Sequence, residues 1–233
     1  SNCVDVCPAK EKALVMKPLE SQLPQQKNWD YIVKNIGYKQ VVDKTKSVKN
    51  LQFAQPLFEF SGACAGCGET PYAKLLTQLY GEKTYWVNGV GCSLAWAGAF
   101  PSLPYTKNKE GRGPAFYGTL FEDQAENGLG MCLAVKQRRN NVKLRVEELR
   151  PMVDGTETAA AIDAWLASFD NLETNDADSR ALVAALEKAE LTGEAKALAD
   201  EILLHKDQLS KKVVWLFGGD GWAYDIGYGG LDH

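Results

Sequence analysis

The stretch that most constrains the fold is KKVVWLFGGDG, residues 211–221. Its apolar run is short and nearly continuous, with charges before it and glycines after it, which is typical of a strand buried on both faces of a sheet. A second run, KTYWVNGVGC at 83–92, indicates a strand that leads into a glycine loop, and SLAWAGAF at 93–100 indicates the helix that follows. Because strand, glycine loop and helix recur, the sequence predicts an α/β fold with a parallel sheet.

Several helices are expected around this sheet. Thr70 suits the N-cap of a helix, Pro71 suits its first turn, and Gly81 would end it. The stretch 102–118 is expected to be a long loop, and helices are expected between 157 and 210. A further helix is predicted through 119–139 by a stripe of apolar residues at helical spacing. The stripe consists of Leu120, Ala125, Leu129, Cys132, Leu133 and Val135.

Charge and hydropathy exclude two classes of partner. The formal net charge of −4 provides no polycationic surface for nucleic acid, and the basic run at 136–145 is interpreted as a solvated helix end. No apolar run approaches the ~20 residues needed to cross a bilayer, and the N-terminus lacks a signal-peptide core. We therefore expect a cytoplasmic protein, in which six cysteines favour metal or redox chemistry over structural disulfides.

Cys64 and Cys67 form a C-x2-C motif among small residues, which allow the backbone to approach a bulky group closely. The spacing alone fits an iron–sulfur cluster, a redox dithiol or a zinc site. Cys92, in the second glycine loop, is a third candidate ligand. The two histidines, His205 and His233, are not paired with cysteines at zinc-finger spacing, so an iron–sulfur site that lacks one ligand is favoured.

Two further motifs carry candidate ligands. CVDVCP, which contains Cys3 and Cys7, matches the closing C-x3-C-P of the ferredoxin run. GGDG places Asp220 between glycines directly after a strand, where a carboxylate can hold Mg²⁺ and glycine amides can approach phosphate oxygens. A bare GDG also forms simple turns, but its place at the carboxyl edge of a parallel sheet favours ligand binding. Cys132 is the remaining cysteine, and its place on an apolar stripe favours core packing.

The chain resembles the pyruvate:ferredoxin (flavodoxin) oxidoreductase family in four stretches: GACAGCGETPY, GCS, PYTKNKEGRGPAFYGTLFEDQAENGLGM and GGDGWAYDIGYGGLDH. The resemblance covers most of the chain and is thin in the connector and in the stretch 157–210. It implies a segment of a longer polypeptide, with the tail of a ferredoxin-like module of two [4Fe–4S] clusters at 1–12. A connector at 13–50 and a truncated thiamine-diphosphate-binding domain at 51–233 would follow.

The resemblance also implies roles for single residues. Cys64, Cys67 and Cys92 would ligate the [4Fe–4S] cluster nearest the thiamine, with a fourth cysteine farther along the polypeptide. Cys3 and Cys7 would each ligate one of the two ferredoxin-type clusters. The cofactor contacts, including Asp220 as the Mg²⁺ ligand, would be Glu69, the backbone around Cys92, Gly219, Asp220, Gly221 and Trp222. The glutamate that activates thiamine lies in another domain of this family, so we assign no catalytic residue here.

The implied reaction is oxidative decarboxylation of pyruvate with coenzyme A to acetyl-CoA and CO2, with electrons passed to ferredoxin or flavodoxin. The full-length protein would be a homodimer. A first alternative is another 2-oxoacid:ferredoxin oxidoreductase. A second is a non-catalytic iron–sulfur electron carrier in which GDG is a simple turn. A third is a zinc-stabilised interaction module built on Cys64, Cys67, Cys92 and Cys132.

Overall fold

The computed structural model of the chain describes residues 2–38, 41–98, 103–118 and 124–232. It divides into two units, Ser1–Asp43 and Lys44–His233, which we call the N-terminal unit and the main unit. The end of the helix expected at 93–100 and the start of the one expected at 119–139, with Leu120, lie outside the described residues.

The N-terminal unit consists of short helices, and none of its described residues is buried. Its elements are α1 (Asn2–Asp5), the 3-10 turns η1 (Leu19–Ser21) and η2 (Leu23–Gln25), and α2 (Gln26–Asn35).

Helix α2 was not anticipated from the sequence. Its apolar residues Trp29, Ile32 and Val33, together with Ile36 at its end, follow the i, i+3, i+4, i+7 spacing of an amphipathic helix, and all four are exposed. The helix is only 10 residues long and lies in a lysine-rich stretch, so its pattern is lost in a longer window.

A three-stranded parallel sheet of order β2-β1-β3 organises the main unit, which confirms the predicted α/β fold. The strands are β1 (Thr84–Asn88), β2 (Ala115–Gly118) and β3 (Val213–Phe217). In the centre of the sheet, Trp86 pairs with Phe116 on one side and with Trp215 on the other.

The burial of the strands differs from the prediction at β3. All five residues of β3 are half-buried rather than buried, whereas Trp86 and Val87 of β1 are fully enclosed. The reason is position: β1 is the central strand, and β3 pairs only with β1 among the described residues. Strand β2 lies in the stretch predicted to be a loop, where four residues next to Gly113 and Pro114 give too short a pattern to recognise.

Helix α4 (Glu69–Tyr80) leads from the cysteine loop to the sheet. Its N-cap is Gly68 rather than Thr70, whose hydroxyl instead lies 2.9 Å from the hydroxyl of Ser61. The predicted end is confirmed: Gly81 is the C-cap, with a φ of 53° that favours glycine. The neighbouring elements are α3 (Val48–Leu51), η3 (Gly81–Lys83) and α5 (Cys92–Ala97).

Aromatic side chains dominate the core beside the sheet. The Phe58 ring packs edge to face on Trp96, with 5.7 Å between ring centroids, and on Tyr105, at 5.5 Å. Trp86 packs in the same way on Phe217, the last residue of β3, at 4.9 Å. Such pairs fix ring orientation as well as burying apolar area, so the end of β3 is held firmly against β1.

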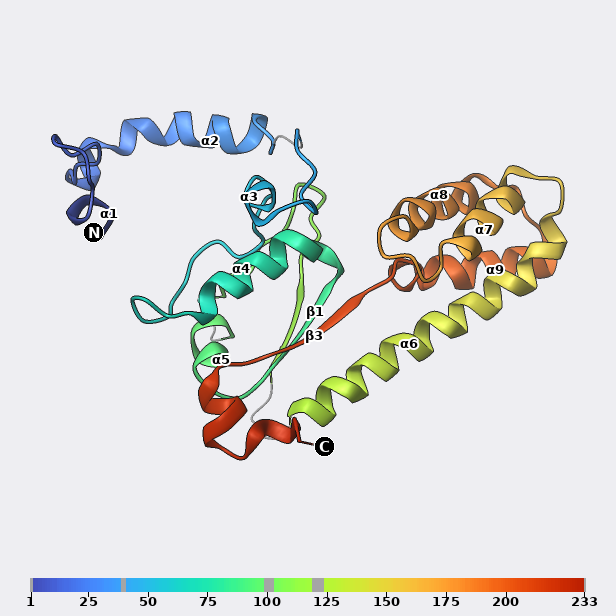
Figure 1. Ribbon diagram of the computed structural model, residues 1–233. Helices are drawn as coiled ribbons and strands as arrows, with labels where there is room; N and C mark the ends of the chain where they lie inside the picture. The colour runs from blue at the N-terminus through green and yellow to red at the C-terminus, as the bar shows by residue number, and fades with distance from the viewer. Residues whose placement is uncertain (1, 39–40, 99–102, 119–123, 233) are drawn as a thin grey trace. The chain divides into compact units, whose positions relative to one another are not determined.

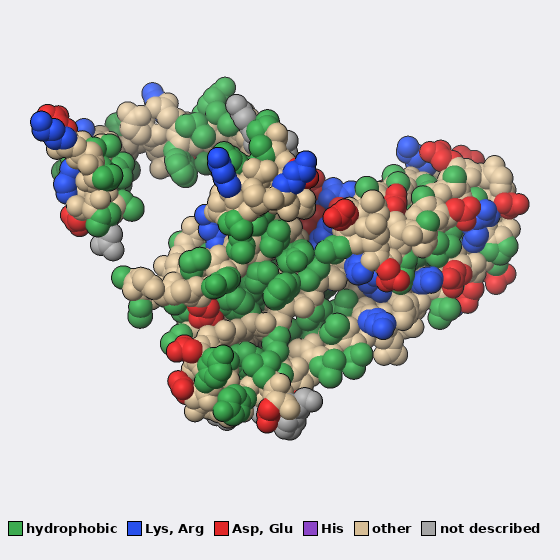
Figure 2. Space-filling model, in the orientation of Figure 1, with side chains coloured by type: hydrophobic (Ala, Val, Ile, Leu, Met, Phe, Trp, Pro, Cys, Tyr) green, Lys and Arg blue, Asp and Glu red, His purple; other side chains and the backbone are tan. Residues whose placement is uncertain are grey.

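The second core of the main unit is helical, as predicted for 157–210. Its elements are α6 (Gln124–Leu149), η4 (Arg150–Val153), α7 (Glu157–Ala167), α8 (Asn175–Lys188), α9 (Gly193–Leu204) and η5 (Lys206–Gln208). Trp165 and Ile162 of α7, Leu182 of α8 and Ile202 of α9 pack together in this core. Figure 1 shows α7, α8 and α9 gathered at one end of the long α6, and Figure 2 shows acidic and basic side chains interspersed over them.

The apolar stripe predicted for α6 is wrong in its burial. Leu129, Cys132 and Leu133 are exposed, whereas Val142 and Val146 farther along are buried. The first half of α6 packs on the sheet through the face that carries Gln124 and Gly128, which are buried, and the predicted stripe lies on another face. Cys132 is therefore not a core residue.

The basic run at 136–145 is also not uniformly solvated, because Arg139 is buried in the helical core. Its guanidinium donates to the carbonyl oxygens of Phe169 at 3.0 Å, Leu209 at 3.2 Å and Gln208 at 3.3 Å, and to Oδ1 of Asn175 at 3.2 Å. The same group lies 4.1 Å from the centre of the Phe169 ring. The planar guanidinium of Arg139 thus connects α6 to the end of α7, the start of α8 and the end of η5.

We expect Arg139→Lys to lower the free energy of unfolding by about 2 kcal/mol, because an ammonium cannot reach all of these acceptors and leaves buried carbonyls unpaired. Urea unfolding of the two proteins measures the change. Arg138→Lys is the matched control, since Arg138 is exposed on the same helix. Equal midpoints for both variants would contradict the proposed role.

Candidate functional site

Two glycine loops meet at the carboxyl edge of the sheet. Strand β1 ends at Asn88 and is followed by a loop that leads to Cys92 at the start of α5. Strand β3 ends at Phe217 and is followed by Gly218, Gly219 and Asp220. The N–H of Gly89 donates to the carbonyl oxygen of Phe217 at 2.7 Å, which joins the two loops at their base. Adjacent parallel strands bring such loops to the same edge, where α/β sheets bind ligands.

The C-x2-C motif forms a tight turn in front of α4. The N–H of Cys67 donates to the carbonyl oxygen of Cys64 at 3.1 Å, and Gly66 between them has a φ of 78°. A turn with a left-handed third residue requires glycine at that position. The segment before the turn is stabilised by Ser61, whose hydroxyl accepts a hydrogen bond from the N–H of Ala63 at 3.1 Å.

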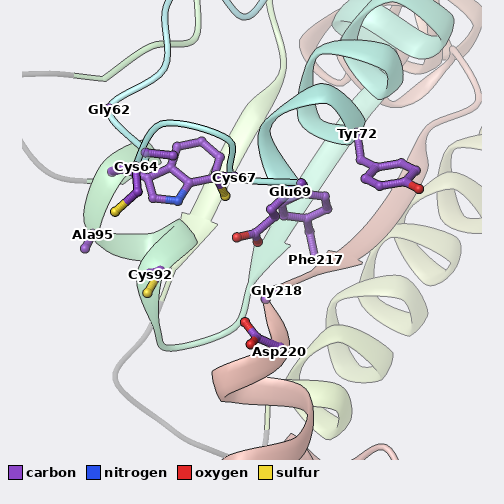
Figure 3. Close-up of a pocket in the computed structure, with 14 residues that line it drawn as sticks. Gly62, Cys64, Cys67, Glu69, Tyr72, Cys92, Ala95, Phe217, Gly218 and Asp220 are labelled. Carbon is purple, nitrogen blue, oxygen red and sulfur yellow. The ribbon is translucent and has the colours of Figure 1, made fainter.

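These three segments line one pocket of about 860 Å³. Cys64, Cys67 and Cys92 contribute thiols to it, and Glu69 and Asp220 contribute carboxylates. Figure 3 shows these five residues around the pocket, with Glu69 on α4 and Asp220 just beyond β3. The structure therefore brings together the cysteines and carboxylates that the sequence analysis selected from separate motifs.

The pocket offers thiolates, which are ligands of iron–sulfur clusters, and carboxylates, which are ligands of Mg²⁺. The thiols are free, those of Cys64 and Cys92 are exposed, and that of Cys67 is half-buried. Within the described ranges, no three His, Cys, Asp or Glu side chains come close enough to hold one metal ion. In an iron–sulfur cluster each thiolate binds a different iron, so its ligands stand apart. Cys132 does not line the pocket, so the four thiols of the zinc alternative are not gathered there.

Glu69 is a half-buried polar side chain of the pocket. Its Oε1 atom is buried and has no hydrogen-bond partner among the described atoms. Burial raises the pKa of Glu69, a hydrogen bond with Ser93 opposes the rise, and the negative charge of Asp220 adds to it. A Cβ atom at Gly219 would lie 3.1 Å from its Oε2 atom, so a larger residue there would require the Glu69 carboxylate to shift slightly. A cation would relieve both the unpartnered oxygen and the repulsion between the carboxylates.

Gly221 and Trp222 do not line the pocket, although Gly219 and Asp220 do. Both belong to the π-helical turn η6 (Gly221–Asp225), which precedes η7 (Tyr228–Gly230). The Trp222 side chain is only 4% exposed. Trp222 is therefore enclosed by the protein and is not exposed to the pocket.

Sequence reasoning missed Asn88 and Ser93. Ser93 is fully buried, its hydroxyl accepts from the side-chain amide of Asn88 at 3.0 Å, and it bonds to Glu69. Asn88 therefore orients the Ser93 hydroxyl, and Ser93 in turn holds the Glu69 carboxylate through a hydrogen bond. Ser93 directly follows Cys92, and the sequence gives no separate signal for a residue that acts through another side chain.

Cys3 and Cys7 belong to the N-terminal unit. Hydrogen bonds from the backbone N–H groups of Ala9 and Ala13 lower the pKa of the Cys7 thiol. Cys3 lies on α1 and is exposed. Donors of this kind favour a thiolate, the form that binds metals.

The chain was compared with known proteins. No protein-family model matches it. A pyruvate:ferredoxin oxidoreductase of Moorella thermoacetica is 46% identical over the whole chain. Pyruvate-flavodoxin oxidoreductases of Enterobacter agglomerans and Klebsiella pneumoniae are each 44% identical, again over the whole chain. The chain spans 20% of the length of each of these relatives. Over its whole length the chain is therefore similar to one segment of pyruvate:ferredoxin and pyruvate-flavodoxin oxidoreductases.

Proposed function

We propose that this chain forms the thiamine and proximal-cluster part of an enzyme that oxidises pyruvate. Pyruvate and coenzyme A would yield acetyl-CoA, CO2, one proton and two electrons, and the electrons would pass through [4Fe–4S] clusters to ferredoxin or flavodoxin. The observation that carries the proposal is the shared pocket of three thiols and two carboxylates at the edge of a parallel sheet. The names of the relatives support the substrate and the acceptors.

The chemistry would come from two bound groups. Thiamine diphosphate supplies a centre that stabilises the carbanion formed when CO2 leaves a 2-oxoacid, and an iron–sulfur cluster supplies a one-electron acceptor. The residues of this chain would hold these groups next to each other. Because the pocket is common to Cys92 and Asp220, one cavity would contain both the electron donor and its first acceptor.

The cluster would be bound by Cys64, Cys67 and Cys92, with a fourth ligand outside the described residues. Asp220 would bind Mg²⁺, which usually takes one or two carboxylates together with phosphate oxygens. The backbone N–H groups from Gly219 to Trp222 would face the diphosphate. Glu69, which is hydrogen-bonded to Ser93 and lies beside Gly219, would also contact the cofactor.

The remaining parts of the chain would serve electron exit and assembly. Residues 1–12 would complete a ferredoxin-like module with Cys3 and Cys7 as ligands, and 13–50 would connect it to the thiamine-binding domain at 51–233. The lowered pKa of Cys7 supports the ligand role. No helix in the described ranges has the length and apolar character of a membrane span. The enzyme would be a cytoplasmic homodimer that neither enters a membrane nor binds nucleic acid.

The function is tested in the whole protein, purified without oxygen. Pyruvate should reduce ferredoxin or flavodoxin only when coenzyme A is present, with two electrons transferred for each acetyl-CoA formed. Assays with 2-oxoglutarate, indolepyruvate and a branched 2-oxoacid should give much lower kcat/KM values. Preference for one of these acids would support the related 2-oxoacid oxidoreductases instead. Iron and visible absorption without turnover of any 2-oxoacid would support the electron carrier, and stoichiometric zinc without iron would support the interaction module.

A further inference from the structure

The Trp222 side chain fills a slot made by glycines from three segments of the main unit. A Cβ atom at Gly89, after β1, would lie 2.4 Å from the indole, and one at Gly218, after β3, would also lie at 2.4 Å. At Gly229, in η7, the distance would be 2.3 Å. Atoms this close cannot coexist, so the backbone meets the indole directly at all three positions.

The slot joins the two halves of the candidate site. Gly89 starts the loop that ends at Cys92, and Gly218 starts the turn that contains Asp220. The hydrogen bond from the N–H of Gly89 to the carbonyl oxygen of Phe217 links the bases of these loops, where Asn88 and Phe217 pair in the sheet. Beyond it the indole lies between the two backbones and touches both. The spacing of the loops is therefore set by a rigid planar group whose own position is fixed from the third side by Gly229.

We propose that Trp222 is a positioning residue whose indole sets the separation between the Cys92 loop and the Asp220 turn. The inference rests on the proposed function only for the identity of the groups that the two loops bind. The contact of the indole with both loops does not depend on that function. A smaller side chain would leave a gap, and the two loops would shift relative to each other. The distance between the Cys92 thiol and the Asp220 carboxylate would then no longer be fixed.

Gly229→Ala tests the proposal from the side remote from the pocket. The new Cβ atom would collide with the indole, while every residue that lines the pocket stays unchanged. Gly227→Ala is its matched control, because Gly227 also has a positive φ, of 91°, but a Cβ atom there would meet nothing within 4 Å. Backbone strain would be common to both variants, and displacement of the indole would occur only in the first.

Trp222→Phe is the second variant, and Trp165→Phe is its control. Trp165 is also fully buried but lies in the helical core, where it donates to Ser179 and Leu209. Both substitutions should lower the melting temperature. Only Trp222→Phe should change the positions of the two loops. The comparison with Trp165→Phe therefore distinguishes a loss of loop positioning from a general loss of stability.

The whole protein is measured in two ways, well below its melting temperature. Hydrogen exchange should become faster in peptides that cover 89–92 and also in those that cover 218–221, for Gly229→Ala and Trp222→Phe but for neither control. The affinity for thiamine diphosphate with Mg²⁺ should fall about 10- to 100-fold in the same two variants, as is usual when support for a metal ligand is lost.

Unchanged exchange in the 89–92 peptides of Gly229→Ala would overturn the inference, as would equal changes in Gly227→Ala. If the parental protein binds no thiamine diphosphate, the proposed function fails, and the exchange data alone still decide whether Trp222 couples the loops. Coupled exchange without a change in affinity would show that the spacing of the loops does not position the cofactor, which also overturns the proposed role.

Discussion

Asp220→Ala is expected to weaken Mg²⁺-dependent binding of thiamine diphosphate by more than about 100-fold, with no change in iron content. Asp220 is the carboxylate that follows β3 in the pocket, and Mg²⁺ there has few other anionic ligands available. The backbone N–H groups of the turn would remain, but without the metal they would face a highly charged diphosphate alone.

We do not expect Glu69, the other carboxylate of the pocket, to restore Mg²⁺-dependent binding in Asp220→Ala. Glu69 is the first residue of α4, and its carboxylate is held by a hydrogen bond with Ser93. Removing Asp220 takes away the nearby negative charge that raises the pKa of Glu69, so Glu69 becomes more readily ionised and not less. A loss of binding must therefore come from the missing ligand, since the remaining carboxylate is made more available to a cation.

The measurement is a titration of the whole protein with thiamine diphosphate at fixed Mg²⁺, together with an iron assay on the same sample. Asp225→Ala is the matched control, because Asp225 carries the same charge on η6 but is exposed and lies outside the pocket lining. Parental affinity and parental turnover of pyruvate in Asp220→Ala would show that Asp220 does not anchor the metal. A loss of iron along with the cofactor would show that the turn has collapsed.

The meeting of Cys92 and Asp220 could be predicted because it follows from local patterns and one rule of topology. Each strand, with the glycine loop after it, is visible in about ten residues of sequence, and neighbouring parallel strands place such loops at one edge. The C-terminal glycine of α4 was predictable for the same reason, since a left-handed cap is a local requirement.

What could not be predicted depends on partners distant in the sequence. The spacing of Leu129 and Leu133 is helical whether or not a core lies against them, so their exposure is decided by where the other helices pack. In the sequence Arg139 cannot be distinguished from the exposed Arg138. Its burial depends on four acceptors from other segments of the chain. Trp222 was assigned to the cofactor through the family resemblance, and its packing against Gly229 has no signal in the local pattern.

Replacing any one of the three pocket cysteines with serine should remove one cluster, which amounts to about four irons for each chain. A serine hydroxyl is far less acidic than a thiol, so it does not supply the anionic ligand that iron requires. Cys92→Ser is the most informative of these variants, because Cys92 comes from α5 whereas the other two come from the turn before α4. Loss of this one cluster from Cys92→Ser would show that the two segments bind one group.

Cys132→Ser is the matched control, since Cys132 is an exposed thiol on α6 that does not line the pocket. Iron content, visible absorption and electron paramagnetic resonance after reduction should match the parent. The Cys92→Ser protein should retain the signals of the two other clusters, those assigned to Cys3 and Cys7, and should lose electron transfer from pyruvate. If iron falls in Cys132→Ser and stays constant in Cys92→Ser, the cluster lies elsewhere, and the pocket does not bring an electron acceptor to the thiamine.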